Sequence, residues 1–525
     1  MDGRLGVREP MLRHSGTKYV NASQGSAVKD LKEKTIRGGA ARLVGHGARA
    51  VVRLAMLMTL ARILDPSDFG LVAMVTAVTG VFEVFATGGL STATVQRVEV
   101  SRGQISTLFW LNIAIGALLG LLCLSAAPIL STFYNDPRTA LVIVAVAPAF
   151  VINATGVQHL AMLQRELRYV TLAVIEVTSE VIAATIAISM AVAGFGYWAI
   201  VATVIAGPLV ITIGAWVTSG WRPGAPQRIG DVSSMLRFGG AITVYGLVVY
   251  IAYNIEKILI GRYYGSDALG LYGRAYELIN LPNRIISMAI GVVAFSSLAR
   301  LQTEPARLKS YFLKGFSLFT AITVPATLAC LVFADDMILV MLGSKWTEAV
   351  PIFQLLAPSV LVLGIIQPLA WLLMALGLQE RTLKISLALA PLVICSYLVG
   401  LPYGPSGVAL AFSATMIVWL VPHVLWSLHG TIISARDLLA SAARPALSAT
   451  VAALVAMSVV SFATAIPWPI LRLALGGTVM LAVYAFMLLF VMKQSGFYWD
   501  LWLGLRGGFG SRRVGLEGAS ATKLS

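Results

Sequence analysis

Two arginines stand four residues apart inside an apolar run near the start of the chain. Arg49 and Arg53 fall at i and i+4, which places both on one face of a helix, where two cations repel each other. A charged side chain at the centre of a bilayer costs about 2.5–3.5 kcal/mol on insertion scales, so its presence suggests a function. We expect this face to line a wet cavity that receives an anion. The alternative is that both side chains extend back to the headgroups.

Carboxylates occupy comparable positions in other apolar runs. Glu176 and Glu180 also share a helical face. Carboxylates in a low dielectric can exchange protons near neutral pH, so they could couple transport to a proton or sodium gradient; alternatively, they form internal ion pairs with the arginines. The candidate residues form a cationic substrate-binding group, Arg49, Arg53, Arg274 and Arg284, and a coupling or gating group, Glu83, Glu176, Glu180, Glu256, Lys257 and Glu277.

Two of these candidates are adjacent in sequence. Glu256 and Lys257 point about 100° apart on a helix, so each needs its own partner. We expect Glu256 to face the cavity or an arginine of the first run, and Lys257 to reach the outer headgroups. Pro282, in the run that follows, removes a helical hydrogen bond, which is tolerated where a helix lines a cavity.

The composition is that of an integral membrane protein. The 525 residues are 58% hydrophobic and only 12% charged, whereas soluble domains carry about 25% charged residues. The net charge of +15 is spread between apolar runs rather than gathered in one patch. This pattern indicates positive-inside membrane topology and argues against a nucleic-acid partner.

Spanning helices require about 20 apolar residues each, and the chain contains fourteen such runs. They predict an all-α polytopic membrane protein with about 14 transmembrane helices. The runs cover residues 41–62, 69–94, 105–128, 139–160, 170–193, 197–217, 238–262, 269–291, 311–334, 350–375, 383–401, 406–427, 444–464 and 470–492.

The distribution of Lys and Arg predicts that both termini are cytoplasmic. Only five of the 39 Lys and Arg residues fall in the loops assigned to the outside: Arg62, Arg138, Arg262, Lys345 and Arg472. Residues 1–40 are basic and lack the apolar core of a signal peptide, so we expect a partly disordered cytoplasmic tail. Residues 493–525 form the second tail.

An internal repeat divides the runs into two halves. Residues 61–71 resemble residues 261–271, and further short matches recur in the same order. We expect two parallel six-helix repeats, which form lobes at 41–217 and 238–427, a cytoplasmic linker at 218–237 and an extra helix pair at 428–492. This architecture is typical of transporters with a substrate site between the lobes.

The sequence contains no recognisable catalytic motif or domain. The longest outer loop, about Asp335 to Val350, leaves no room for a catalytic domain, and there is no phosphate-binding Walker loop. The five histidines are scattered without metal-ligand spacing. We expect no enzymatic activity, no metal and no cofactor.

Several stretches resemble bacterial polysaccharide flippases of the O-antigen and colanic-acid type, within the multidrug/oligosaccharidyl-lipid/polysaccharide exporter superfamily. They are LARILDPSDFGL at 60–71, GGLSTATVQR at 88–97, the segment 253–276 with Pro282, and LGSKW at 342–346. The family signature usually has aspartate where this chain has Glu256, so the resemblance implies a role for the charge rather than a strict geometry.

The resemblance implies an inner-membrane transporter that moves undecaprenyl-diphosphate-linked oligosaccharides to the outer leaflet by alternating access, for exopolysaccharide, capsule or O-antigen synthesis. It further implies contact with membrane lipids, a polysaccharide polymerase and a chain-length regulator. The alternatives are a lipid II flippase and a multidrug antiporter of the same superfamily. Basic spans disfavour the antiporter, since cationic drugs call for an acidic cavity. A polymerase or ligase fits less well, because it would carry a large outer loop.

Overall fold

A computed structural model of the chain describes residues 17–87, 94, 100–226, 233–462, 466–496, 498 and 503. These residues form helices joined by short connections, with no strand among them. The helices are α1 Thr17–Ile63, α2 Pro66–Thr87, α4 Arg102–Tyr134, α5 Arg138–Val146, α6 Pro148–Arg165, α7 Tyr169–Val192, α8 Trp198–Ser219, α9 Ser233–Ala252, α10 Ile255–Arg300, α11 Pro305–Val332, α12 Ala334–Met341, α13 Ala349–Ala375, α14 Gln379–Gly400, α15 Gly404–Leu428, α16 Ala435–Phe462 and α17 Pro469–Phe486. Two short 3-10 helices, η2 Ser344–Trp346 and η3 Leu401–Tyr403, and the π-helical turn η5 Met487–Val491 complete them.

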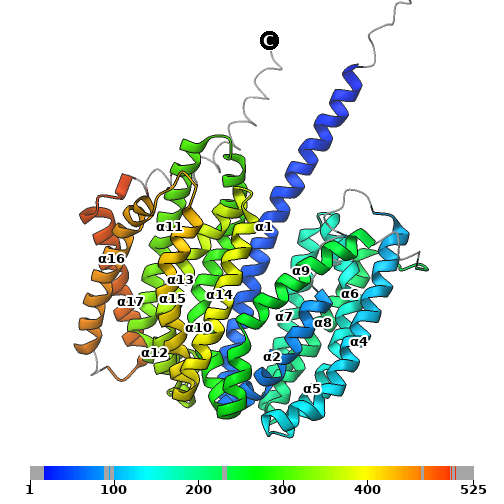
Figure 1. Cartoon of the computed structure of the whole chain (residues 1–525), viewed down its shortest axis with the longest axis horizontal. Helices are drawn as coiled ribbons and strands as arrows, with labels where there is room; N and C mark the ends of the chain where they lie inside the picture. Colours follow the sequence, from blue (N-terminus) through cyan, green and yellow to red (C-terminus); the bar gives the residue numbers. More distant parts are fainter. Residues whose placement is uncertain are drawn as a thin grey trace, which may run out of the picture.

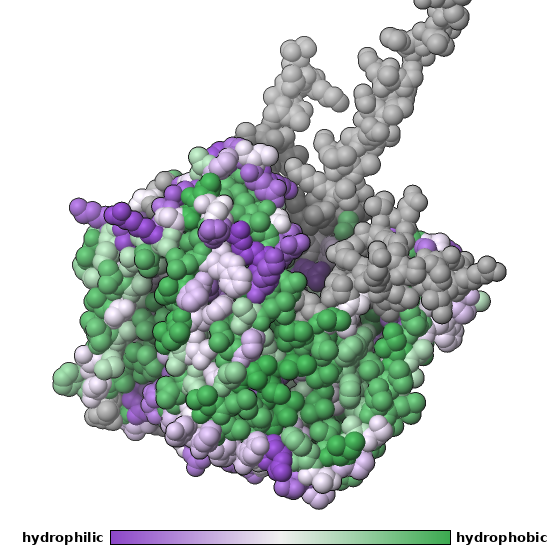
Figure 2. Space-filling model, in the orientation of Figure 1, coloured by the Kyte–Doolittle hydropathy of each residue, from purple (hydrophilic) through white to green (hydrophobic). Residues whose placement is uncertain are grey.

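The helices are those of a multi-pass membrane protein. Among the described residues, 11 segments are long and apolar enough to cross a bilayer. One of them, Gln379–Leu428, contains both α14 and α15, which the sequence predicted as separate runs. Helices α9 and α10 coincide with two more predicted runs but are not among the 11; α10 carries charged residues along its length. Figure 2 shows a broad apolar belt between two more polar edges. The all-α membrane fold is confirmed, and the count of fourteen stays a prediction.

The helices gather into two groups with α1 between them (Figure 1). In the first group, α4 packs on α6, and α8 packs on both α6 and α7. In the second, α13 packs on α10 and α15, and α14 packs on α15. Helix α1 packs along α7, while the pair α16 and α17 lies against α11 and α12 at the edge of the second group. The predicted domain boundaries are compatible with this arrangement and stay a prediction.

Local sequence signals fix the ends of α4. Ser101 Oγ accepts from the Gln104 amide at 3.1 Å, and Gln104 Oε1 accepts from the Ser101 amide at 3.0 Å, which is a capping box. Asn135 ends the helix in the left-handed conformation with φ 53°, which asparagine tolerates. In the connection that follows, hydrogen bonds from Arg138 hold the pKa of the Asp136 carboxyl below its usual value.

The structure corrects one expectation about continuity and leaves another open. The tail predicted over residues 1–40 stays a prediction, since residues 1–16 lie outside the described part and α1 begins at Thr17. The run predicted over 238–262 is broken, because α9 ends at Ala252 and α10 begins at Ile255. Asn254 takes a non-helical backbone there, and its side-chain amide donates to the Tyr250 carbonyl at 2.9 Å. This side-chain bond caps one of the carbonyls released by the break.

The predicted outer loop is structured and ties the second group to α1. Within it, Trp346 is fully buried on η2 and donates its indole N–H to the Ala61 carbonyl at 2.8 Å. Arg62 donates to the Val340 carbonyl at 2.8 Å, and the Lys345 ammonium lies 2.7 Å from the Asp65 carboxylate. The two groups are therefore joined at the C-terminal end of α1.

Helices α2 and α10 approach each other so closely that only glycine fits at the contact. A Cβ at Gly70 would lie 1.6 Å from the Ser266 carbonyl oxygen, and one at Gly270 would lie 1.9 Å from the Pro66 carbonyl oxygen. Both glycines belong to the repeated stretches found in the sequence. The stretches that resemble each other are thus in direct backbone contact.

We predict that Gly70→Ala and Gly270→Ala destabilise the protein, because each methyl group would force two backbones apart. Overpacking of this kind costs about 1–3 kcal/mol. Thermal unfolding of the purified protein in detergent measures the effect. Gly273→Ala on the same helix is the matched control, since nothing lies within 4 Å of a Cβ there. Equal melting temperatures for all three variants would contradict the packing argument.

Candidate functional site

A charged cavity of about 450 Å³ lies between α1 and α10, bordered by α7. It is lined by Leu43, His46, Gly47, Arg49, Ala50, Arg53, Glu180, Leu281, Arg284 and Ile285. A narrow extension of about 20 Å³ shares some of these residues and continues along α1 past Leu54 to Leu57. The cavity therefore tapers toward the end of α1 at which the two helix groups are joined.

Arg49 links α1 to the first helix group. Its guanidinium donates to Glu176 Oε2 at 2.9 Å and lies 3.7 Å from Glu180 Oε2. The two carboxylates are on one face of α7, as their spacing predicted. All three side chains are half-buried, with exposed fractions of 32%, 27% and 18%. The structure therefore places Glu176 and Glu180 beside Arg49, and a role of the two carboxylates in coupling or in ion pairing stays a prediction.

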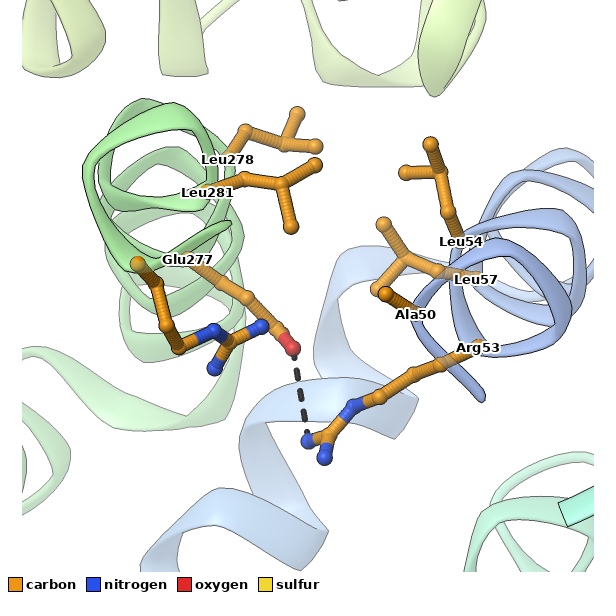
Figure 3. Close-up of a pocket in the computed structure, with 8 residues that line it drawn as sticks. Ala50, Arg53, Leu54, Leu57, Glu277, Leu278 and Leu281 are labelled. Carbon is orange, nitrogen blue, oxygen red and sulfur yellow. Dashed lines mark hydrogen bonds and ion pairs between the residues drawn. The ribbon is translucent and has the colours of Figure 1, made fainter. Parts of the chain in front are cut away.

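Arg53 links α1 to the second helix group (Figure 3). Its guanidinium lies 3.5 Å from Glu277 Oε1 on α10, and the other carboxylate oxygen lies 2.6 Å from Arg274. Arg274 also lies over the Phe69 ring, 5.0 Å from its centroid. Glu277 is therefore shared by two arginines, and Arg274 is held between α10 and α2 rather than in the cavity lining.

The remaining cation of the binding group, Arg284, lines both the cavity and its narrow extension. Within the described part of the chain it forms no ion pair, and its side chain is exposed. His46 joins this lining and was not among the predicted site residues. Its position three residues before Arg49 places it on the same helical face, so the spacing could have revealed it.

Glu256 is not where the sequence placed it. It is only 1% exposed, lines neither the cavity nor its extension, and forms no ion pair with the α1 arginines whose side chains the structure describes. Its charge acts instead on the phenol groups of Tyr272, Tyr276 and Tyr397. Its Oε2 has no hydrogen-bond partner in the described structure. The expectation that Glu256 faces the cavity is wrong, because the break before α10 turns it into the core of the second group.

Lys257 and Glu83 also lie outside the cavity lining. The Lys257 ammonium donates to Asn254 Oδ1 at 2.7 Å, and its charge acts on Glu277, so it belongs to the charged network rather than to the outer headgroups. Glu83 is exposed on α2, where its charge acts on Tyr250. Neither position provides a group for direct contact with a ligand in the cavity.

Two of the arginines that line the cavity are placed to contact an anion. Arg284 forms no close ion pair among the described residues, although its charge acts on Glu277, and Arg53 is held by Glu277 only at 3.5 Å. Guanidinium groups bind phosphate through paired N–H donors, which makes arginine suited to this role. The described residues contain no group of three or more His, Cys, Asp or Glu side chains that could hold a metal ion.

Comparison with known sequences assigns the family. The profile of the family described as "Polysaccharide biosynthesis protein" matches residues 59–351, more than half of the chain. The chain belongs to this family. The resemblance seen in the sequence is thereby confirmed, and the matched part contains the whole of α10 with Glu277 and Arg284. The chain is a multi-pass inner-membrane protein of bacterial type.

Individual relatives in the family have names from polysaccharide synthesis. The chain is 27% identical over 395 residues to the lipopolysaccharide biosynthesis protein WzxC of Escherichia coli (strain K12), with 74% of this chain and 80% of the relative covered. It is 31% identical over 294 residues to the teichuronic acid biosynthesis protein TuaB of Bacillus subtilis (strain 168), covering 55% and 60%. It is 26% identical over 300 residues to the succinoglycan biosynthesis transport protein ExoT of Rhizobium meliloti (strain 1021), covering 57% and 61%.

Solved structures share the fold. The lipid II flippase MurJ in an inward closed conformation aligns with a TM-score of 0.71 at 14% identity, covering 87% of this chain and 98% of that one. An inward-facing multidrug resistance MATE family transporter of the MOP superfamily aligns with a TM-score of 0.58, also at 14% identity, covering 72% and 93%. At such identities the likeness establishes the fold alone.

We predict that Arg49 and Glu176 are energetically coupled. Removing one charge leaves the other half-buried without its closest partner, whereas removing both leaves neither unpaired. A double-mutant cycle with Arg49→Met and Glu176→Met should give a coupling of about 0.5–3 kcal/mol, in the range for residues in contact. Thermal unfolding in detergent provides the four stabilities. Additive effects of the two substitutions would contradict the ion pair, and Arg307→Met, on an exposed residue, serves as a control for charge removal.

Proposed function

We propose that this protein is an inner-membrane flippase that moves undecaprenyl-diphosphate-linked oligosaccharide units to the outer leaflet by alternating access. The product would be an exopolysaccharide, a capsule or an O-antigen. Family membership and the names of the relatives support a role in polysaccharide export. The cationic cavity between the two helix groups supports a lipid-linked diphosphate as the part of the substrate that is recognised.

The charge of the cavity carries the proposal. Arg49, Arg53, Arg284 and His46 line it, against the single carboxylate of Glu180, with Glu277 at the narrow extension. A diphosphate brings the negative charge that Arg284 and Arg53 are placed to take. The volume of about 450 Å³ falls within the range of about 300–1,000 Å³ for ligand pockets. It suits a diphosphate with its first sugar rather than a whole oligosaccharide.

Two exposed apolar side chains at the border of the cavity would allow the rest of the substrate to extend out of it. Leu43 and Ile285 border it with exposed apolar side chains, 47% and 48% accessible. A polyprenyl chain in the bilayer is compatible with such an apolar border. In the proposed topology of fourteen passes, two six-helix halves and cytoplasmic termini, the wide end faces the cytoplasm, where the substrate is made.

Energy coupling is part of the proposal, with a proton or sodium gradient in place of any cofactor. Glu256, buried with an oxygen that lacks a partner in the described structure, is the carboxylate that could exchange a cation. Glu277 could respond to the substrate directly, because a phosphate bound by Arg53 would compete for the same guanidinium. Glu83, Glu176, Glu180 and Lys257 would act through gating. A polymerase and a chain-length regulator are the proposed protein partners.

Loss of Arg53 and Arg284, two of the three arginines that line the cavity, should strongly reduce export. We expect a strain that lacks its own exporter to produce polymer when complemented with the wild-type gene, and Arg53→Ala/Arg284→Ala to reduce polymer at least about tenfold. Hydrogen bonds to charged groups contribute about 1.5–3 kcal/mol each, which is about tenfold or more per arginine. Polymer released to the medium and polymer precursor retained in the cell are both quantified.

Two control variants distinguish the loss of positive charge in the cavity from a general loss of folded protein. Arg53→Lys retains the charge and should restore part of the export, while Arg307→Ala removes an exposed arginine outside the cavity and should leave it unchanged. Membrane levels of each variant are compared by immunoblotting. Normal export by the double variant would refute the cationic-cavity proposal.

The choice between a polysaccharide precursor and lipid II as substrate can be tested by expressing the gene in strains that lack one or the other transporter. We expect the gene to restore polymer in a strain that lacks a polysaccharide exporter and not to restore growth when the lipid II flippase is depleted. The reason is that both substrates carry a polyprenyl diphosphate, so the discrimination must lie in the sugar. Rescue of growth without rescue of polymer would favour a lipid II flippase instead.

A further inference from the structure

An open basic pocket lies between α11, α16 and the segment after η5, and shares no lining residue with the cavity between α1 and α10. It has a volume of about 270 Å³ and is lined by Leu313, Lys314, Ser317, Ser441, Arg444, Lys493 and Gln494. The pocket therefore combines three cations, two hydroxyls and an amide from three segments of the chain. No carboxylate is among the described residues that line it.

Helical spacing explains why these side chains meet. Lys314 and Ser317 stand at i and i+3 on α11, and Ser441 and Arg444 stand at i and i+3 on α16, so each pair shares a face. Helices α11 and α16 pack against each other, which brings the two faces together. Lys493 enters from the segment after η5.

The cations of this pocket are not engaged by protein carboxylates. In the described ranges, neither Lys314, Arg444 nor Lys493 forms an ion pair, whereas the neighbouring Lys309 lies 2.7 Å from Asp437. Gln494 adds a buried side-chain oxygen that lacks a hydrogen-bond partner. Since the two ends of an amide are exchanged by a flip of the side chain, Gln494 can turn its N–H₂ donors toward an anion in the pocket.

An apolar stripe runs from the pocket along the outside of α16. Leu447, Val451 and Leu454 follow Arg444 at intervals of three, seven and ten residues, which keeps them close to one helical face. All three are exposed, at 56%, 37% and 57%. In a membrane-spanning helix, such a stripe is in contact with acyl chains.

We propose that this pocket binds the phosphate of an anionic phospholipid headgroup, with the acyl chains lying along α16. The three cations and the serine hydroxyls match a phosphodiester, and basic pockets between helices on the cytoplasmic side are a known type of headgroup site. A zwitterionic headgroup fits less well, because its ammonium group would meet three cations. The adjoining apolar stripe favours a lipid over a soluble phosphate compound. This site is independent of the proposed transport substrate and gives the extra helix pair a role in lipid binding.

Lipid titration of the purified full-length protein tests the proposal. Phosphatidylglycerol and phosphatidylcholine are added to delipidated protein in detergent, and bound lipid is counted by native mass spectrometry while thermal unfolding is followed in parallel. We expect phosphatidylglycerol to bind more tightly than phosphatidylcholine. Lys314→Gln and Arg444→Gln should each weaken its binding about fivefold, and the double variant about 25-fold, as expected for one cation near an anionic lipid.

Two control variants distinguish binding in this pocket from general electrostatic attraction between the basic protein and an anionic lipid. Arg436→Gln removes a cation from the same helix outside the pocket and should leave the affinity unchanged, while Arg444→Lys should retain most of it. Without added lipid, the melting temperature of each variant reports whether it is folded. If a variant fails to fold, Arg444→Lys and Ser441→Ala provide the comparison.

Three results would overturn the proposal. The first is equal binding of phosphatidylglycerol and phosphatidylcholine, and the second is an unchanged affinity in the double variant. The third is a rise in melting temperature with inorganic phosphate or glycerophosphoglycerol at the concentrations at which phosphatidylglycerol raises it. That third result would assign the pocket to a soluble phosphate compound. Because lipid binding is measured without transport, a failure here leaves the proposed flippase function unaffected.

Discussion

Arginine side chains within a bilayer have to be compensated, and in this protein the compensation joins the two halves of the molecule. Arg49 is held by carboxylates on α7, and Arg53 lies opposite Glu277 on α10. Helix α1 is thereby the element to which both groups attach through charge. These pairs are partly exposed, with 32% of the Arg49 side chain and 54% of the Arg53 side chain accessible, so water shares in the compensation. Arg284 lines the same cavity and forms no close ion pair among the described residues.

The middle and the C-terminal end of α1 are held by different sets of contacts. Toward the middle they are the ion pairs of Arg49 and Arg53, which an entering anion can disturb by competing for a guanidinium. Near Ile63 they are the buried Trp346, the hydrogen bond from Arg62 to the Val340 carbonyl and the ion pair of Lys345 with Asp65. The cavity is lined by Arg49 and Arg53 and not by the residues near Ile63. A ligand in the cavity would therefore disturb the contacts of Arg49 and Arg53 first.

Sequence reasoning predicted the helices, the cationic face of α1 and the shared face of Glu176 and Glu180, because periodicity and hydropathy determine these directly. It could not assign their partners, since Glu176 lies 127 residues from Arg49 in the chain. Glu256 was misplaced for a local reason: the helix is interrupted at Asn254, and a prediction that assumed one continuous helix over residues 238–262 assigned Glu256 to the wrong face. The second basic pocket was also missed, because its cations come from segments far apart in the sequence.

Near the end of α1, side chains donate hydrogen bonds to backbone carbonyls, and this determines which of the residues tolerate substitution. Every residue offers a carbonyl, so Ala61 and Val340 can be replaced without loss of the acceptor, whereas Trp346 and Arg62 provide donors that few residues can imitate. Tyr250, which donates to the Thr76 and Ala77 carbonyls, follows the same rule. A saturation mutagenesis map should therefore be asymmetric across this junction, with narrow tolerance on the donor side and broad tolerance, limited only by volume, on the acceptor side.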